Sequence, residues 1–143
     1  MYYWSDRAGF LRDRFEHDYS EIRARKGNRP VIDLISAQLP PCLETNLYAV
    51  PTRSAKDLVP PAKSTDVLEY LFQTIRPALV FVHSNTPIRF FEKCTGCSSF
   101  TSEMKRARWH GHEFWIRGRP GALYTLSHEK AAALGAEMAR YLG

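Results

Sequence analysis

The stretch ALVFVHSN, residues 78–85, decides the fold of this chain. Its first five residues are apolar without interruption, which is typical of a short strand buried on both faces of a parallel sheet. The polar residues 83–85 then lead into residues 86–93, where Pro87 is favourable near the start of a helix. A buried strand that is followed directly by a helix indicates an α/β domain.

The segments around this strand predict the other elements of such a domain. Ser127 is expected to cap the last of four further helices. Residues 42–46 and 113–117 predict two more strands, whereas residues 94–108 show no regular pattern and the Pro-rich residues 47–63 predict a long loop. Apolar side chains recur at helical spacing over residues 5–26, 31–39, 65–75 and 128–142.

Three strands that alternate with helices predict a single α/β domain over residues 1–143. We expect a three-layer α/β/α arrangement, in which helices cover both faces of a small, mainly parallel sheet. A sheet of three strands is thin, which raises the suspicion that a partner strand is missing.

The composition excludes several classes of protein. No run approaches the ~18 uninterrupted apolar residues that a membrane span requires, so we expect no integral membrane protein. The start of the chain shows no signal peptide, and three Cys do not suit a disulfide framework, so we expect reduced thiols and a cytoplasmic location. The net charge of +5 permits a polyanionic partner without requiring one.

Ligands of α/β sheets bind at the carboxyl ends of the strands, which singles out three places in this sequence. They are residues 44–48, 83–86 and 118–126. In the first place, a strand that ends at Thr45-Asn46 presents a side-chain amide, whose donor and acceptor can read the edge of a nucleobase. Asn is also a common turn former, so the alternative role of Asn46 is to cap or turn the loop.

Residues 31–93 resemble the uracil-DNA glycosylase superfamily in the order and character of their elements. An apolar helix precedes LETNLYAVPT, residues 43–52, which looks like the second strand of that family with its base-recognising Asn. The stretch IRPALVFVHSNTPIRFF, residues 75–91, looks like the third strand and the helix after it. Residues 113–117 with their exit loop look like the fourth strand.

The resemblance implies a domain that binds DNA or a nucleobase at the carboxyl ends of its strands. It implies that Asn46 reads the base, that Tyr48 packs or stacks in the pocket, and that Ser84 and Asn85 line it. This interpretation involves no cofactor.

The resemblance also raises cleavage of the N-glycosidic bond of a damaged base, which would make the chain a hydrolase of DNA repair. The family's first motif, a Gly-rich strand exit with an acidic residue that activates water, has no counterpart in residues 1–10, so it is expected upstream of residue 1 or lost. His128 is the imidazole nearest to the position of the family's catalytic His. His83 is the other candidate acid or base, or it simply donates a hydrogen bond to the neighbouring loop.

Basic residues near the proposed crevice are candidates for contacts with the nucleic-acid backbone. Together with Trp109 and Trp115, they would combine phosphate binding with base stacking. A solvated basic surface is an equal alternative. The residues are Lys105, Arg106, Arg108, Arg117 and Arg119.

A second class of function is a non-catalytic α/β binding or interaction protein, with or without a stabilising zinc ion. Cys94 and Cys97 have the spacing of a zinc knuckle, and His110 and His112 complete a set of four tetrahedral ligands. The two His are separated by one residue instead of the usual three to five. Free thiols and two solvated imidazoles are therefore the alternative interpretation.

Overall fold

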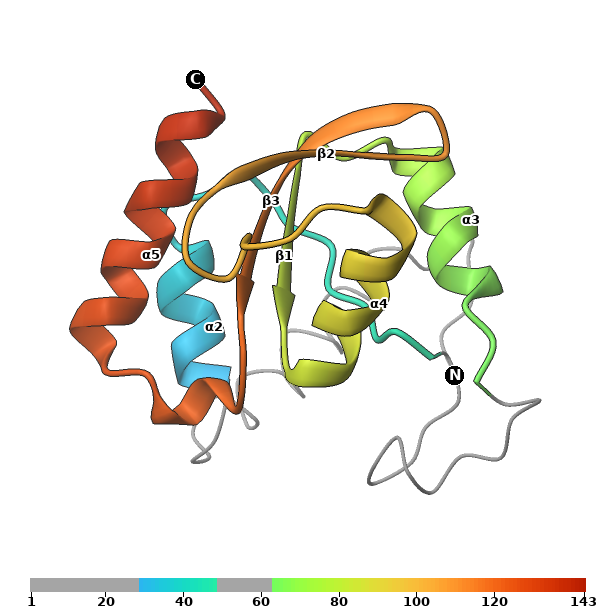
Figure 1. Ribbon diagram of the computed structural model, residues 1–143. Coiled ribbons are helices and arrows are strands. Elements are labelled where there is room, and N and C mark those ends of the chain that lie inside the picture. Colours follow the sequence, from blue (N-terminus) through green and yellow to red (C-terminus); the bar gives the residue numbers. More distant parts are fainter. Residues whose placement is uncertain (1–28, 49–62) are drawn as a thin grey trace, which may run out of the picture.

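Figure 1 shows a computed structural model of the chain, which describes residues 29–48 and 63–143. The predicted helix over residues 5–26 lies outside the described residues, as does most of the Pro-rich loop. None of the helices in the described ranges is long and apolar enough to cross a bilayer. The elements are α2 (Arg29–Ser36), α3 (Asp66–Ile75), β1 (Leu79–His83), α4 (Asn85–Thr95), β2 (Lys105–Trp109), β3 (His112–Arg119), the 3-10 helix η3 (Leu123–Thr125) and α5 (His128–Tyr141).

Most of the predicted elements that fall on described residues are confirmed. The stretch of residues 78–85 forms β1 and the entry to α4, and β3 contains the strand predicted at residues 113–117. Helix α5 begins after Ser127, as predicted, because the Ser127 hydroxyl accepts a hydrogen bond of 3.2 Å from the N–H of Lys130. The structure is thus a mixed α/β fold.

The three strands form one sheet in the order β1-β3-β2. β1 runs parallel to β3, with Leu79 opposite Trp115 and His83 opposite Arg119. β2 runs antiparallel to β3, so the prediction of a mainly parallel sheet is wrong and the sheet is mixed. The cause is that β2 and β3 form a hairpin, which needs no crossover helix between its strands.

All but the last residue of β2 lies in the stretch of residues 94–108, in which the sequence shows no regular pattern. Its side chains alternate between buried Ala107 and exposed Arg106 and Arg108, a pattern of period two that the density of basic residues obscures. The turn that joins it to β3 consists of His110 and Gly111, with φ values of 47° and 70°. Two positive φ angles are what a tight two-residue hairpin requires.

The strand predicted at residues 42–46 is also wrong. Residues 41–46 form no regular secondary structure, and their side chains are exposed. A strand is stable only where its backbone groups pair with a neighbouring strand, and no described strand pairs with this segment. Thr45 and Asn46 therefore do not occupy the end of a strand.

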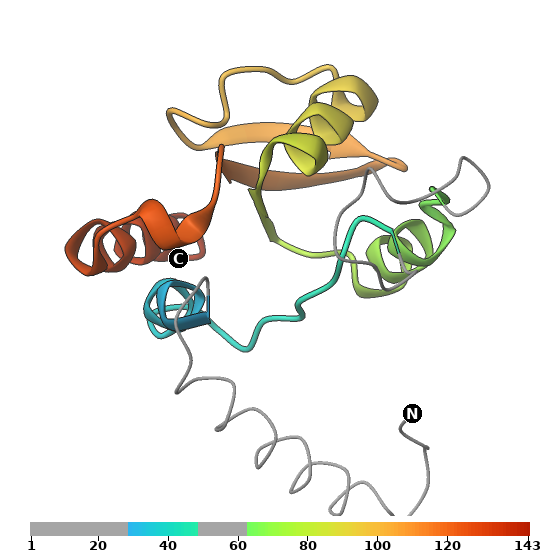
Figure 2. The same cartoon turned by 90° about the horizontal axis from the view of Figure 1, so that it is seen from below.

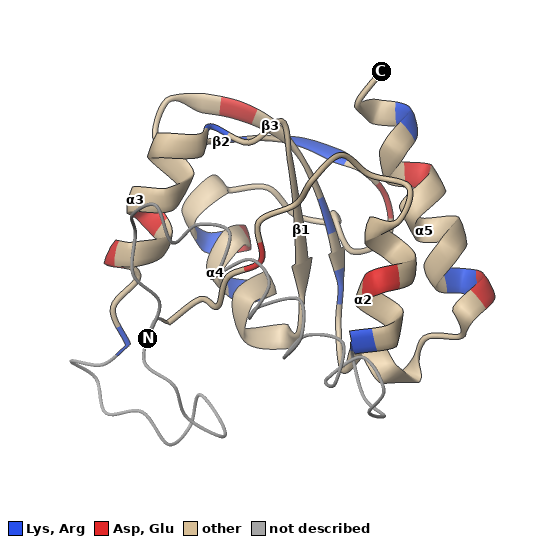
Figure 3. Ribbon diagram, turned by 180° about the vertical axis from the view of Figure 1, so that it is seen from behind, with Lys and Arg blue, Asp and Glu red and all other residues tan. Residues whose placement is uncertain are grey.

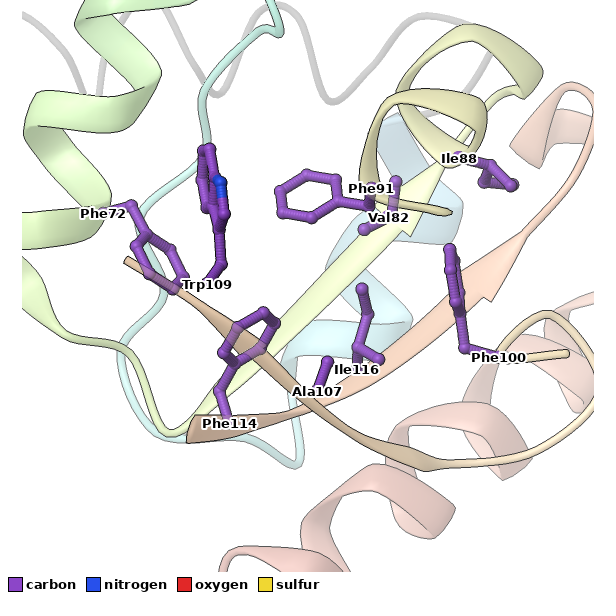
Figure 4. Close-up of a cluster of buried hydrophobic side chains, with 9 residues drawn as sticks. All are labelled: Phe72, Val82, Ile88, Phe91, Phe100, Ala107, Trp109, Phe114 and Ile116. Atoms are coloured by element: carbon purple, nitrogen blue, oxygen red, sulfur yellow. The ribbon is translucent and has the colours of Figure 1, made fainter. Parts of the chain in front are cut away.

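Alternation along the strands divides their side chains between two hydrophobic clusters. Val82, Phe114 and Ile116 belong to a cluster that includes Phe72 of α3 and Phe91 of α4 (Figure 4). The other cluster joins α2 and α5, and half-buried strand residues pack against it. These residues are Leu79, Phe81 and Trp115. Figure 2 shows α4 on one side of the sheet and α2 with α5 on the other.

The close approach of α2 to α5 depends on Gly135, which is buried in α5. A Cβ atom at this position would collide with the backbone carbonyl oxygen of Ile35 in α2. Backbone atoms cannot move aside as the end of a flexible side chain does. The glycine therefore fixes how tightly the two helices pack on their face of the sheet.

Replacing Gly135 with Ala is expected to destabilise the protein by about 1–3 kcal/mol because the added methyl overpacks the contact with Ile35. Helix propensity alone would stabilise this variant by about 1 kcal/mol. Urea unfolding of the two proteins measures the sign. The exposed Ala133→Gly change provides the propensity control, and a stabilised Gly135→Ala variant would show that the helices are not in close contact.

Candidate functional site

β1 and β3 end at the same edge of the sheet, with His83 and Arg119 in register as neighbours. Both side chains project from the face that α2 and α5 cover, because they alternate in step with Phe81 and Trp115. A histidine and an arginine therefore lie side by side at the carboxyl ends of the two parallel strands. This is the edge at which α/β sheets bind their ligands.

Arg119 carries a donor that no described residue accepts. Its Nε atom, like that of Arg117, is buried and has no hydrogen-bond partner among the described residues. Leaving a buried, charged donor unpaired costs more than an ordinary lost hydrogen bond, so such groups are rare and call for an explanation. An acceptor on a bound anion would satisfy it.

His83 is half-buried, and burial lowers its pKa below the ordinary histidine value. The charge of Glu44 partly opposes this decrease of the pKa, and the charge of Arg29 adds to it. The imidazole is therefore neutral near pH 7, where it offers one hydrogen-bond donor and one acceptor. The Ser84 hydroxyl lies 3.4 Å from its Nδ1 atom.

An ion pair links the segment before the long loop to the start of α2. Arg29 donates two hydrogen bonds to the carboxylate of Glu44, at 2.8 and 2.5 Å. Such a paired contact of guanidinium with carboxylate is geometrically specific. It holds Glu44 close enough for its charge to act on the pKa of His83. Asn46 follows two residues later and has an exposed side chain. Sequence patterns could not indicate this pair, since its members lie 15 residues apart.

Ser84 and Asn85 connect the exits of the two parallel strands. The N–H of Ser84 donates to the carbonyl of Arg119 at 3.1 Å, and the side chain of Asn85 accepts from the N–H of Gly121 at 3.1 Å. Ser84 has φ 76° and ψ 152°, a backbone conformation that is essentially confined to glycine. These bonds hold the turn in place despite its strain.

Two helices begin at this edge of the sheet, α4 directly after Ser84 and α5 after the exit loop of β3 (Figure 1). Helix N-termini carry a partial positive charge, which adds to the charge of Arg119. The predicted catalytic candidate His128 is exposed in the first turn of α5. The predicted base-packing residue Tyr48 is half-buried at the end of the described segment.

The five predicted backbone contacts lie on two strands, among the basic positions that Figure 3 marks in blue, and are not all at the strand exit. Lys105, Arg106 and Arg108 lie on β2, which pairs with β3 only from His112 to Ile116 and so stops short of Arg119. Salt bridges and a ring contact engage two of them. They are Lys105 with Glu103 at 2.7 Å, Arg106 with Glu113 at 3.7 Å, and Arg106 over the ring of Trp115 at 5.1 Å.

Arg117 is on the same face as Arg119 but makes contacts inside the domain. One of its terminal nitrogens donates to the carbonyl groups of Thr101 at 2.5 Å and Gly118 at 2.9 Å. Its Nε atom lies 3.5 Å from the carboxylate of Glu137 in α5. Arg117 thus ties a loop and a helix to β3, which leaves Arg119 as the basic residue at the strand exit.

The four predicted zinc ligands have separate partners. The Cys94 thiol donates to the carbonyl of Phe91 in the same helix, and burial is the chief reason that its pKa is raised to about 11. His110 pairs with Glu69 of α3 at 2.9 Å, and His112 contacts the carbonyl of Pro77 at 2.7 Å. Among the described residues, no three His, Cys, Asp or Glu side chains form a group that could hold a metal.

Comparisons with known proteins found no match for this chain among family models, curated proteins or solved structures.

The lowered pKa of His83 predicts how the free energy of unfolding depends on pH. In the unfolded chain His83 is protonated near its ordinary pKa of about 6.5, whereas in the folded protein it is protonated only at lower pH. The free energy of unfolding therefore falls as the pH drops from about 6.5 toward the lowered pKa of the folded state. His83→Gln is expected to flatten that dependence in urea unfolding between pH 7.5 and pH 5. His128→Gln, at an exposed site, is the matched control. An unchanged slope in His83→Gln would show that His83 titrates alike in both states.

Proposed function

We propose that this domain binds DNA or a nucleobase at the carboxyl ends of β1 and β3, in a three-layer α/β/α fold that resembles the uracil-DNA glycosylase superfamily. One observation carries the proposal: the Nε donor of Arg119, which no described residue accepts, lies beside a neutral histidine at this edge. The N-terminus of α4, which begins directly after Ser84, favours an anion there. A phosphate supplies both the negative charge and the missing acceptor.

Two side chains could suit a nucleobase. At this edge the neutral imidazole of His83 has a donor and an acceptor, and so does the exposed amide of Asn46, two residues after Glu44. The Arg29–Glu44 pair anchors the segment that carries Asn46. The side chain of Asn46 is exposed, and its backbone is not part of a strand. We assign Arg119 to the phosphate and Asn46 to the base.

The proposal extends to cleavage of the N-glycosidic bond, with His83 as the proton donor or acceptor. A neutral imidazole can take a proton from water or donate a hydrogen bond to the departing base. Of the two candidates, His83 is favoured over His128, because it is half-buried and adjoins Arg119, whereas His128 is exposed.

Fluorescence anisotropy with a short single-stranded oligonucleotide that contains uracil tests the binding proposal. Arg119→Gln is expected to weaken binding about tenfold and to lower the salt dependence by about one phosphate contact. Arg140→Gln, in the last turn of α5 at the other end of that helix, is the matched control and should leave affinity unchanged. Equal loss in both variants would show non-specific attraction, and no salt-dependent binding by the wild-type protein would overturn the proposal.

Release of free uracil from the same oligonucleotide tests cleavage. Asn46→Ala and His83→Gln should each abolish release, whereas Gln73→Ala removes an exposed amide from α3 and should have no effect. Binding without release would confine the function to recognition. Release that survives in both variants would contradict the roles assigned to Asn46 and His83.

A further inference from the structure

Cys94 and Cys97 lie on either side of the turn that ends α4, and the proposed function uses neither thiol. Both side chains are half-buried, and neither residue is in a disulfide. Two residues separate them, which is the spacing of the Cys-X-X-Cys motif of disulfide exchange. A disulfide at this spacing requires that the backbone direct both side chains to the same side.

Gly96 turns the backbone between the two cysteines. It has φ 66°, and its N–H donates to the carbonyl of Glu92 at 3.0 Å, so the helix ends in a left-handed residue. Both thiols then pack against one hydrophobic cluster, which contains Phe91 and Trp109 (Figure 4). The two side chains are therefore directed to the same region of the domain.

The carbonyl group of Phe91 connects the two cysteines through hydrogen bonds. It accepts from the Cys94 thiol at 3.8 Å and from the Thr95 hydroxyl at 2.5 Å. The Thr95 oxygen in turn accepts from the N–H of Cys97 at 3.1 Å. These contacts hold the backbone of Cys97 against the last turn of α4, where Cys94 lies.

The two thiols have different surroundings. Burial is the chief reason that the pKa of Cys94 is raised to about 11, so this thiol stays protonated near pH 7 and is a weak nucleophile. The Cys97 sulfur lies 4.0 Å from the carbonyl oxygen of Arg106 in β2. The pKa of Lys105 is raised chiefly by its hydrogen bond to Glu103, and Cys97 adds to this increase, so an ammonium group lies near Cys97. The first attack on an external disulfide therefore falls to Cys97.

We propose that Cys94 and Cys97 form a reversible intramolecular disulfide by exchange with a low-molecular-weight disulfide such as oxidised glutathione. The Cys97 thiolate attacks the glutathione disulfide, breaks its S–S bond and releases one glutathione thiolate. The Cys94 thiol then loses its proton to water and attacks the Cys97 sulfur, which releases the second glutathione.

The exchange balances, because two protein thiols are oxidised while one glutathione disulfide is reduced to two thiols. The two protons that the cysteines lose are taken up by the two glutathione thiolates. The proposal is independent of the nucleic-acid function, because the cysteines lie at the end of α4 and the proposed binding edge lies at its start.

Titration of the Cys42→Ser protein with mixtures of oxidised and reduced glutathione tests the proposal, since this change removes the exposed third cysteine. After acid quenching and labelling with N-ethylmaleimide, mass spectrometry should show two labels on the reduced protein. The oxidised protein should carry no label and no glutathione. Adding Cys94→Ser should instead trap glutathione on Cys97. A Cys42→Ser protein that keeps two labels, or that carries glutathione without an internal disulfide, overturns the proposal.

Gly96→Ala tests whether the fold favours the disulfide beyond the spacing of the cysteines. Alanine has open space at this position but is strained at φ 66°, and only the reduced protein can relax the turn. The equilibrium constant for oxidation should therefore fall about fivefold. Gly121→Ala, with φ 74° and equally open space, is the matched control and should leave the constant unchanged. In concentrated urea the constant should fall about tenfold, because the unfolded chain does not hold the turn. Equal constants in the folded and unfolded protein overturn the proposal.

Discussion

The parallel pairing of β1 with β3 is the constraint on which the rest of the structure depends. It sets His83 opposite Arg119, and it directs Leu79 and Phe81 to one face and Val82 to the other. Each face then receives its own helices, so both clusters derive from one register. A shift of the pairing by a single residue would send the arginine and the histidine to opposite faces, and the edge would lose its paired polar groups.

Electrostatics at the carboxyl edge point to an anion. A guanidinium whose buried Nε has no partner among the described residues lies next to a histidine that burial keeps neutral, the N-terminus of α4 adds partial positive charge, and Arg29 pairs with the nearby Glu44. The strained backbone of Ser84 is retained at the same place. Strained residues of this kind persist where the surrounding structure holds them, and they cluster at binding and active sites.

The fold could be predicted from the sequence wherever a local pattern is sufficient. The apolar run of β1, the cap at Ser127 and the helical spacing of α2 to α5 each have a signature within a few residues. β2 was missed because three basic residues in five conceal its alternation, although the His110-Gly111 turn was an available signal. The segment at residues 42–46 has strand-like residues but no partner strand among the described ones.

The site was predictable only in part. Strand exits placed His83, Ser84, Asn85 and Arg119 correctly at one edge, because the carboxyl ends of parallel strands must coincide. The use of Arg117 inside the domain and the pairing of Arg29 with Glu44 depend on contacts between distant segments. No local sequence pattern encodes such contacts. The sequence therefore predicted the same phosphate-binding role for Arg117 and Arg119.

Binding at the carboxyl edge is tested most directly by an NMR titration of the protein with a uracil-containing oligonucleotide. Backbone chemical shifts are expected to change at residues 83–85 and 119–121, with the side chain of Arg119 among the groups most affected. Chemical-shift changes confined to β2, at residues 105–109, would place the nucleic acid on the other edge of the sheet and contradict binding at the ends of β1 and β3.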